Sequence, residues 1–455
     1  MRKKVTKMVR GTVLCTLLSL VACGGNTFSV GGTISGLSGT VVLQNNGTSN
    51  LSISANGAFT FAGYLTGGSA YNVTVFSQPT DQTCTVSSGS GTVNSTVTSV
   101  IVNCANISPP RFAYVANSGS DTISQYTIVG GALTAMTKAP ATVSAGNAPN
   151  SIAVYRSVTA TYAYVANLGS NDIWQYSIGT DGALSKISAT NPVAGSAPSS
   201  ITINIAASGT SYAYVANSGN DTVSQYTIGN DGVLDVTSLK PVPAGKKPRC
   251  IAIHPSGEYA YVVNSGSDDI WQYAIDKTNG ALSKISTVSL PGSAPYSITI
   301  TAATASGPYY AYVANSGGSN VSQYTIDKQN GNLNTMAAAV SAGTTPYSVA
   351  VDPSGKYAYV ANSGSGNISQ YTIGVSGSGT DGALKPMTPA TVAAAVGSTP
   401  HSVTVDPSGQ YVYAANYDSY TISQYAIGGG GALVPNTTAA TVTTDKNPAF
   451  IITVR

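Results

Sequence analysis

The chain has 455 residues, of which 42% are hydrophobic and only 8% are charged. Disorder requires few apolar residues and a high net charge, so this composition excludes a disordered chain. Five of the 20 Lys and Arg residues lie in the first ten positions, and the remaining 15 face 17 Asp and Glu residues. This balance near neutrality indicates no basic surface for nucleic acid.

Residues 1–22 have the pattern of a lipoprotein signal peptide. Basic residues up to Arg10 precede an apolar run, 13–22, that is too short to span a bilayer. Leu20-Val-Ala-Cys23 resembles the bacterial lipoprotein box, which is cleaved before a Cys that then carries lipid. The alternative is an ordinary secretory peptide cut elsewhere. We expect a lipid anchor at Cys23, which places the protein in the bacterial cell envelope, at the outer membrane or cell surface.

Residues 23–106 are expected to form a small β-sandwich, because short β-rich runs such as 40–43, 51–61 and 71–75 alternate with turns. The segment is similar to immunoglobulin-like or transthyretin-like modules of bacterial surface proteins. Cys84 and Cys104 are expected to form a disulfide, since an exported domain with a thin core gains about 3 kcal/mol from one. Two free buried thiols are the alternative.

After a linker at 107–110, one unit recurs seven times between residues 111 and 455. Its sixth copy reads Tyr357-Ala-Tyr-Val-Ala-Asn362, a Ser/Gly loop and Ile368-Ser-Gln-Tyr-Thr-Ile373. A Gln always follows the Asn by eight residues, whereas the period varies from 47 to 54 residues. A fixed hairpin with variable outer loops is typical of propeller blades. The seven asparagines are Asn117, Asn167, Asn217, Asn264, Asn315, Asn362 and Asn416.

Each copy is expected to hold four strands, but the first copy lacks its first strand. The tail 447–455 matches the pattern of that missing strand, as in 148–154. We therefore expect the tail to supply the innermost strand of blade one, which closes the ring and leaves no open edge. The predicted fold is all-β: a seven-bladed β-propeller at 111–455, preceded by the sandwich.

The residue after the proline that opens each first strand is expected to face the mouth of the central channel. Arg249, Tyr296, Tyr347 and His401 are the candidate ligand-binding residues, with Lys246 and Lys247 on the rim. Three cations in one loop predict a positive potential, and the tyrosines offer flat apolar faces, so a small anion or acidic saccharide is the expected ligand. Alternatively, Arg249 is a solvated loop charge and His401 a rim residue without a partner. The full ring is Ala449, Asn150, Ser199, Arg249, Tyr296, Tyr347 and His401.

The Tyr-Val-Ala-Asn repeats resemble the lactonase-type seven-bladed propellers, which include 6-phosphogluconolactonase, over residues 111–455. Blade four of that family tends to read Pro-Arg-His at its start and Asn-Glu at its end. Here Arg249 is retained, but Cys250 and Ser265 stand at the His and Glu positions. The resemblance therefore implies that the acid–base pair is missing, and no residue is placed by sequence to activate Cys250. The catalytic residues stay unidentified.

Two functions remain open. The first is a surface binding or scaffolding module for a small anion, a saccharide or another envelope protein. The second is a lactonase with an atypical site. His254, which ends a first strand, is expected to serve a turn. No zinc spacing, phosphate loop or Ser-nucleophile elbow is present in the sequence, so we expect no cofactor and no metal. We expect a monomer.

Replacing Cys23 with Ser should release the protein from the membrane fraction, because lipid on this sulfur is the predicted anchor. The test is membrane fractionation followed by immunoblotting, with wild type as the reference. A Cys23→Ser protein that stays membrane-bound would show that the lipoprotein interpretation is wrong.

Overall fold

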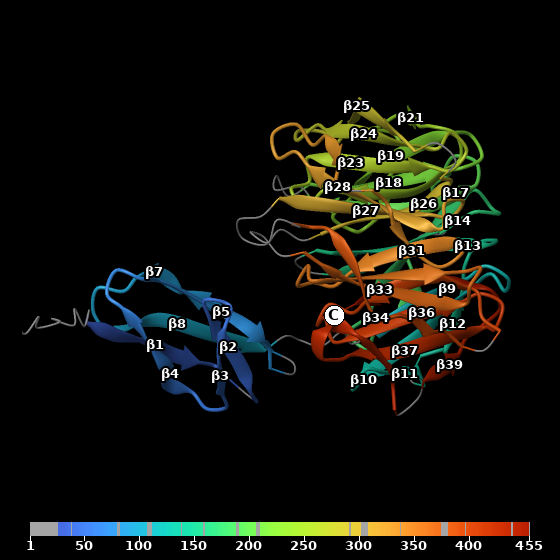
Figure 1. Ribbon diagram of the computed structural model, residues 1–455. Helices are drawn as coiled ribbons and strands as arrows, with labels where there is room; N and C mark the ends of the chain where they lie inside the picture. Colours follow the sequence, from blue (N-terminus) through green and yellow to red (C-terminus); the bar gives the residue numbers. More distant parts are fainter. Residues whose placement is uncertain are drawn as a thin grey trace, which may run out of the picture. The chain divides into compact units, whose positions relative to one another are not determined.

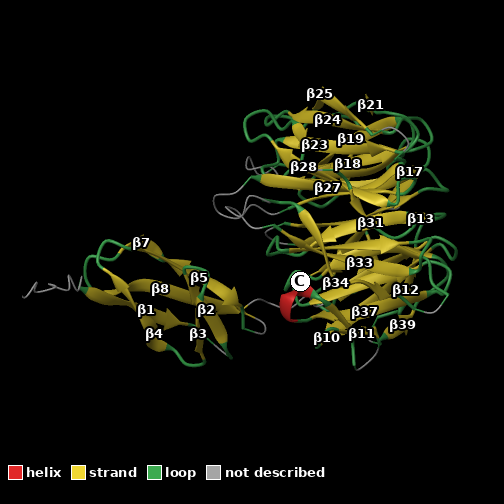
Figure 2. Ribbon diagram, viewed as in Figure 1, coloured by secondary structure: helices red, strands yellow, loops and turns green. Residues whose placement is uncertain are grey.

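The computed structural model describes residues 26–37, 39–79, 82–106, 112–137, 139–157, 160–187, 191–205, 210–290, 293–301, 308–336, 338–374, 381–395, 397–437 and 440–454. The predicted signal peptide 1–22, Cys23 and the linker 107–110 lie outside these residues. The chain divides into two compact units, Met1–Ile107 and Ser108–Arg455. Strands dominate the described residues, whose single helical element is the 3-10 turn η1 (Gly429–Gly431) (Figure 2). None of these residues forms a helix long and apolar enough to cross a bilayer.

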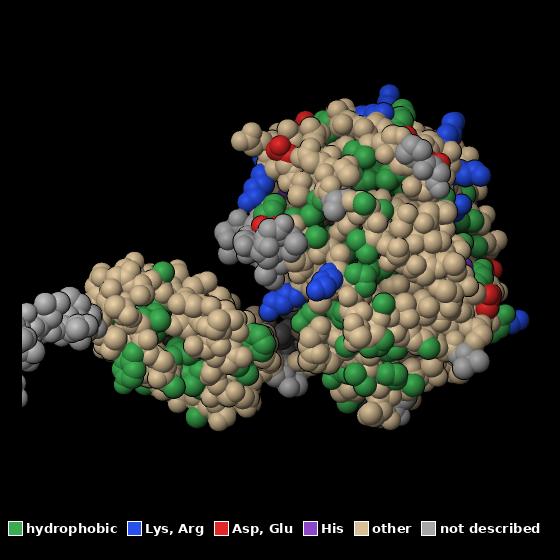
Figure 3. Space-filling view, viewed as in Figure 1, with side chains coloured by type: hydrophobic (Ala, Val, Ile, Leu, Met, Phe, Trp, Pro, Cys, Tyr) green, Lys and Arg blue, Asp and Glu red, His purple; other side chains and the backbone are tan. Residues whose placement is uncertain are grey.

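The first unit contains two four-stranded sheets, ordered β4-β1-β8-β6 and β3-β2-β5-β7. Their inward side chains form one core around Val30, Val41 and Leu43. The predicted disulfide is present: it joins Cys84 and Cys104, which lie opposite each other on β6 and β8. Asp81 is the only charged residue between 24 and 106, and this unit shows no charged side chain on the face in Figure 3. The strands are β1 (Thr27–Ser35), β2 (Val41–Asn45), β3 (Ser49–Ile53), β4 (Gly57–Thr66), β5 (Ala70–Ser77), β6 (Gln82–Ser87), β7 (Ser90–Thr92) and β8 (Val97–Asn106).

The second unit contains seven antiparallel sheets, one for each sequence repeat (Figure 1). The innermost strands are β40 (Pro448–Val454), β13 (Pro149–Arg156), β17 (Pro198–Ile205), β22 (Pro248–Ile253), β26 (Pro295–Ile300), β31 (Pro346–Val351) and β35 (Pro400–Val405). The second strands are β9 (Phe112–Asn117), β14 (Thr161–Asn167), β18 (Ser211–Asn217), β23 (Tyr259–Asn264), β27 (Tyr309–Asn315), β32 (Tyr357–Asn362) and β36 (Tyr411–Asn416). The third strands are β10 (Thr122–Val129), β15 (Asp172–Ile178), β19 (Thr222–Ile228), β24 (Asp269–Ile275), β28 (Asn320–Ile326), β33 (Asn367–Ile373) and β37 (Thr421–Ile427).

The outer strands differ between blades. Blades two, four and six have one outer strand each, whereas the other blades have two short strands that pair with the same third strand. The outer strands are β11 (Ala132–Ala135), β12 (Thr142–Ser144), β16 (Leu184–Lys186), β20 (Leu234–Asp235), β21 (Val242–Pro243), β25 (Leu282–Ser289), β29 (Leu333–Thr335), β30 (Val340–Ser341), β34 (Leu384–Ala393), β38 (Leu433–Pro435) and β39 (Thr441–Thr443).

The C-terminal strand β40 pairs antiparallel with β9, the first strand of the propeller sequence. In Figure 1 the red C-terminal strands accordingly lie beside the teal β9 and β10. β40 also contacts the innermost strands of the two neighbouring blades, β13 and β35. It therefore occupies the position that the first repeat leaves without a strand of its own.

A buried tyrosine joins each blade to the next. Tyr312, for example, is fully buried, and its hydroxyl donates a hydrogen bond of 2.7 Å to the carbonyl oxygen of Gly382 in the following blade. The glycine has a φ of 72°, and a Cβ there would lie 2.1 Å from the ring of Tyr310. A glycine is needed because only it tolerates both this φ and this contact. The seven donors are Tyr114, Tyr164, Tyr214, Tyr261, Tyr312, Tyr359 and Tyr413.

The Gln that follows each Asn by eight residues makes a second bond between blades. Its side-chain oxygen accepts a hydrogen bond from the backbone N–H of the Leu that begins the outer strand of the next blade; Gln323, for example, accepts from Leu384 at 2.6 Å. A buried N–H without a partner would cost about 1–3 kcal/mol. The spacing between Asn and Gln is constant because both belong to one hairpin, in which Asn362, for example, pairs with Asn367 and Gln370 with Tyr359. The seven acceptors are Gln125, Gln175, Gln225, Gln272, Gln323, Gln370 and Gln424.

Deleting residues 447–455 should abolish cooperative thermal unfolding of the propeller, because the deletion removes β40 and exposes the edges of β9 and of the adjacent blades. Circular dichroism melts provide the measurement. Removing Arg455 alone is the control, since it leaves the β40–β9 pairs in place. A truncated protein that melts like wild type would contradict the structural role of β40.

Candidate functional site

The seven predicted mouth residues all line one open cavity of about 70 Å³ at one end of the central channel. Each innermost strand begins opposite the Asn that ends the second strand, as Pro248 does opposite Asn264. The residues after the prolines therefore converge. The cavity is lined by Asn150, Ser151, Ser199, Ser200, Arg249, Cys250, Tyr296, Ser297, Tyr347, Ser348, His401, Ser402, Ala449 and Phe450.

The cavity is asymmetric. Blades five and six supply Tyr296 and Tyr347, whose rings stack with centroids 4.2 Å apart and an interplanar angle of 8°. The ring of His401 in blade seven meets Tyr347 edge-on at 4.8 Å. Arg249 lies at the other end of this row, with its guanidinium carbon 5.3 Å from the centre of the Tyr296 ring. Blades one to three contribute Phe450 and otherwise small residues, so the row of aromatic rings, the aromatic wall, faces a lining that is mostly small and polar.

Tyr417 extends the aromatic wall and was absent from the predicted set. Its ring stacks on His401 with centroids 4.1 Å apart and an interplanar angle of 16°. Tyr417 directly follows Asn416, at a position where the other six copies have Ser or Leu. That departure from the repeat is the sequence signal that identifies it.

Arg249 is the only charged side chain among the residues that line the cavity. Its Nε donates a hydrogen bond of 3.1 Å to Ser265 Oγ. No carboxylate among the described residues forms an ion pair with it. The guanidinium therefore retains donors that can bind an anionic or carbonyl oxygen.

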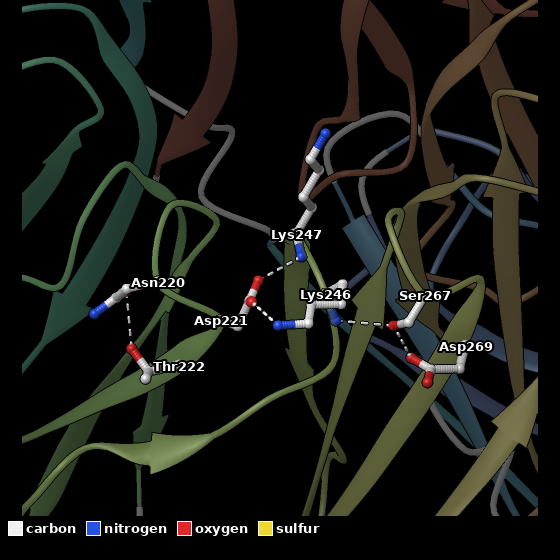
Figure 4. Close-up of polar contacts among 7 residues, drawn as sticks. All are labelled: Asn220, Asp221, Thr222, Lys246, Lys247, Ser267 and Asp269. Carbon is white, nitrogen blue, oxygen red and sulfur yellow. Dashed lines mark hydrogen bonds and ion pairs between the residues drawn. The ribbon is translucent and has the colours of Figure 1, made fainter.

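Lys246 and Lys247, which were predicted on the rim, are not among the residues that line the cavity. Lys246 Nζ forms an ion pair of 2.8 Å with Asp221, and this contact lowers the pKa of the Asp221 carboxyl. The backbone N–H of Lys247 donates to the same carboxylate at 2.8 Å, and its side chain extends away from it (Figure 4). Of the three predicted cations, Arg249 is the one that lines the cavity.

His401 is buried enough for desolvation to lower its pKa from 6.5 to about 4, and the negative charge of Asp418 opposes this effect. Burial disfavours the charged imidazolium, so the ring is a free base at neutral pH. A neutral imidazole in the same cavity as the Arg249 guanidinium can accept a proton from a bound water or hydroxyl group.

The serines that line the floor of the cavity have a structural role. Ser348 Oγ, for example, accepts a hydrogen bond of 3.1 Å from the backbone N–H of Val403 in the next innermost strand. The same contact recurs from Ser151, Ser200, Ser297 and Ser402. These hydroxyls satisfy edge N–H groups, and none is paired with a base that would activate it as a nucleophile.

Cys250 replaces the corresponding serine in blade four. Its Sγ lies 3.9 Å from the carbonyl oxygen of Ile298, and burial raises the pKa of its thiol. A thiol in this protonated state is a poor nucleophile.

His254 serves a turn, as expected: its Nδ1 accepts the N–H of Ser256 at 3.1 Å, much as Asp352 accepts that of Ser354 at 3.0 Å. Among the described residues no group of three or more His, Cys, Asp or Glu is placed to hold a metal ion.

A family model described as "Lactonase, 7-bladed beta-propeller" matches residues 26–300 and 301–384. No curated protein matches the chain. Among solved structures, a Bacteroides fragilis protein provisionally named a 6-phosphogluconolactonase is 19% identical, with a TM-score of 0.63 over 76% of this chain and 98% of that one. The Pseudomonas aeruginosa periplasmic gluconolactonase is 18% identical, with a TM-score of 0.59 over 76% of this chain and 99% of that one. At these identities the two structures show the fold alone, and they agree with the predicted propeller.

Replacing Arg249 with Ala should weaken the binding of an acidic sugar such as gluconate by about 10- to 100-fold, because a charge-assisted bond contributes about 1.5–3 kcal/mol. Isothermal titration at low salt provides the measurement. Lys246→Ala is the matched control and should bind like wild type, since Lys246 is paired with Asp221. Equal affinity of wild type and Arg249→Ala would remove this cavity as the binding site.

Proposed function

The chain belongs to the lactonase family of seven-bladed β-propellers, and from this premise we propose that it hydrolyses a lactone ring at the mouth of its central channel. The sequence alone favours a binding module, with lactone hydrolysis as the alternative. Family membership and one observation at the mouth instead favour lactone hydrolysis over binding alone. That observation is a neutral imidazole, His401, in the same cavity as an unpaired guanidinium, Arg249.

These two groups suffice for ester hydrolysis in chemical terms. His401 takes a proton from water as the water oxygen bonds to the lactone carbonyl carbon. The carbonyl oxygen becomes an oxyanion, which Arg249 stabilises by charge and hydrogen bonding. The ring C–O bond then breaks, and the imidazolium returns its proton to the leaving alkoxide. The product is a hydroxy acid, so one water is consumed for each ring opened.

The cavity supports a sugar lactone without a phosphate. A phosphate monoester carries about two negative charges, whereas Arg249 is the one charged residue of the lining. The aromatic wall fits the apolar face of a sugar ring. A volume of about 70 Å³ holds only the ester end of such a molecule, so the hydroxyl-bearing remainder would extend from the mouth into solvent.

Binding without turnover is the second candidate. It is supported by Cys250 and Ser265, which stand where the family tends to have His and Glu, and by the protonated state of the Cys250 thiol. In this case the ligand would be an acidic saccharide or a group on another envelope protein. For either function we propose export through residues 1–22 and anchoring through Cys23, on the strength of the sequence pattern alone.

Purified mature protein should hydrolyse at least one member of a panel of aldonolactones, measured by acid release in a pH-stat. His401→Gln and Arg249→Ala should each lower kcat/KM by about 100-fold or more, while Lys246→Ala should not. Because burial holds the pKa of His401 near 4, activity should persist at pH 6 and fall only as the pH drops through about 4. Absence of hydrolysis, together with binding of an acidic sugar that requires Arg249, would favour the second candidate.

A further inference from the structure

The loop after the second strand of blade seven departs from its six counterparts. In those copies a glycine is the second residue after the Asn, whereas blade seven has Asp418. The facing loop lies close to this position: a Cβ would lie 2.1 Å from it at Gly119, 2.5 Å at Gly219 and 3.1 Å at Gly169 and Gly266. Asp418 therefore places a side chain against the facing loop where the other six blades have a glycine. The six glycines are Gly119, Gly169, Gly219, Gly266, Gly317 and Gly364.

The facing loop does differ. The residue before the proline has a φ between 40° and 52° in the other six blades, but Thr399 is absent from the residues with positive φ. A left-handed φ occurs instead at Gly397, with a value of 70°. In this conformation Thr399 Oγ1 donates a hydrogen bond of 2.9 Å to Asp418 Oδ2. The N–H of Tyr417 donates to the Thr399 carbonyl oxygen, also at 2.9 Å. The carboxylate is thus held at a fixed place.

The two features that distinguish blade seven, Asp418 in place of a glycine and the backbone conformation of Thr399, both occur close to His401. Thr399 precedes it by two residues, and Tyr417, whose ring stacks on the imidazole at 4.1 Å, directly precedes Asp418. Repeats that are otherwise consistent tend to break their pattern at functional positions. We propose that Asp418 is a positioning residue that acts through His401: fixed by Thr399, its charge stabilises the imidazolium that forms when His401 accepts a proton. The catalytic part of this inference rests on the proposed function.

Two rings contact the imidazole: Tyr347 at 4.8 Å in an edge-on arrangement and Tyr417 at 4.1 Å in a stacked one. The charge of Asp418 acts on it as well and raises its pKa. Arg249 lies beyond Tyr296 and Tyr347 along the aromatic wall. Asp418 is therefore the group that favours protonation, and burial is the effect that opposes it. Loss of the carboxylate should therefore lower the basicity of His401 further. Salt should weaken the influence of the Asp418 charge on His401, because Asp418 is exposed to solvent.

The chain suits a direct test because it contains only two histidines. His254 belongs to the turn after β22, far along that strand from the mouth, and serves as an internal reference. We would titrate the imidazole NMR signals of the mature protein at low salt and assign them with His401→Gln. Asp418→Asn should lower the midpoint of His401 by about 0.5–1 pH unit and leave that of His254 unchanged. High salt should shrink the difference.

Two further variants separate charge from folding. Asp121→Asn is the matched control, because Asp121 lies in the corresponding loop of blade one and blade two already has Asn171 there. It should leave the His401 midpoint unchanged. Thr399→Val removes the hydroxyl that fixes the carboxylate and should give part of the Asp418→Asn shift. Thermal melts confirm that each variant is folded.

An Asp418→Asn protein whose His401 midpoint equals that of wild type would overturn the inference, whatever the activity. If a lactone substrate is found, Asp418→Asn should lower kcat about tenfold with little change in KM. The acidic limb of its pH–rate profile should move by the same amount as the NMR midpoint of His401. If Asp418→Asn lowers the His401 midpoint but the wild-type protein opens no lactone, the charge pairing is upheld and the proposed hydrolysis is refuted. The two proposals therefore fail separately.

Discussion

The propeller depends on one buried contact, the hydrogen bond from a tyrosine hydroxyl to a glycine carbonyl oxygen in the next blade. Burial raises the pKa of these tyrosines well above its usual value, so the hydroxyl keeps its proton and its role as donor. The contact occurs seven times, including once from Tyr413 in blade seven to Gly131 in blade one. In each blade the glutamine side-chain oxygen makes a second hydrogen bond to the next blade, from its Leu N–H. Together they fix each sheet against its neighbour through the second and third strands.

The residue after the proline of each innermost strand is less constrained, although Ser199 Oγ donates hydrogen bonds to the carbonyl oxygens of Ala216 and Pro248. The second-strand aromatic, the turn glycine, the glutamine and the floor serine are each required by a neighbour, and they recur in nearly every copy. The residue after the proline ranges from Ala449 to Arg249 to Tyr347. The mouth can therefore change its chemistry while the ring of blades stays the same, and here the change is uneven: aromatic groups on one half, small groups on the other.

The fold and the mouth ring could be predicted because both follow from the repeat. Fixed spacing identifies the blades, the unmatched tail identifies β40, and strand direction places the residues after the prolines. The neighbours of these residues could not be predicted in this way. The pairing of Lys246 with Asp221 and of Thr399 with Asp418 depends on residues and backbone conformations of the mouth loops that the repeat does not determine. The neutral state of His401 depends on burial by Tyr347 and Tyr417, which only the assembled mouth provides.

The pairing of β40 with β9 also has a consequence for the order of events in biogenesis. Ser118 and Asn447, which hydrogen-bond at this junction, are 329 residues apart in the sequence. The first blade to leave a ribosome or a translocation pore therefore lacks its inner strand until the last part of the chain emerges. Contacts between such distant segments form slowly. The first blade therefore stays incomplete until the C-terminal residues have emerged. A chain that lacks its last residues therefore cannot complete the first blade.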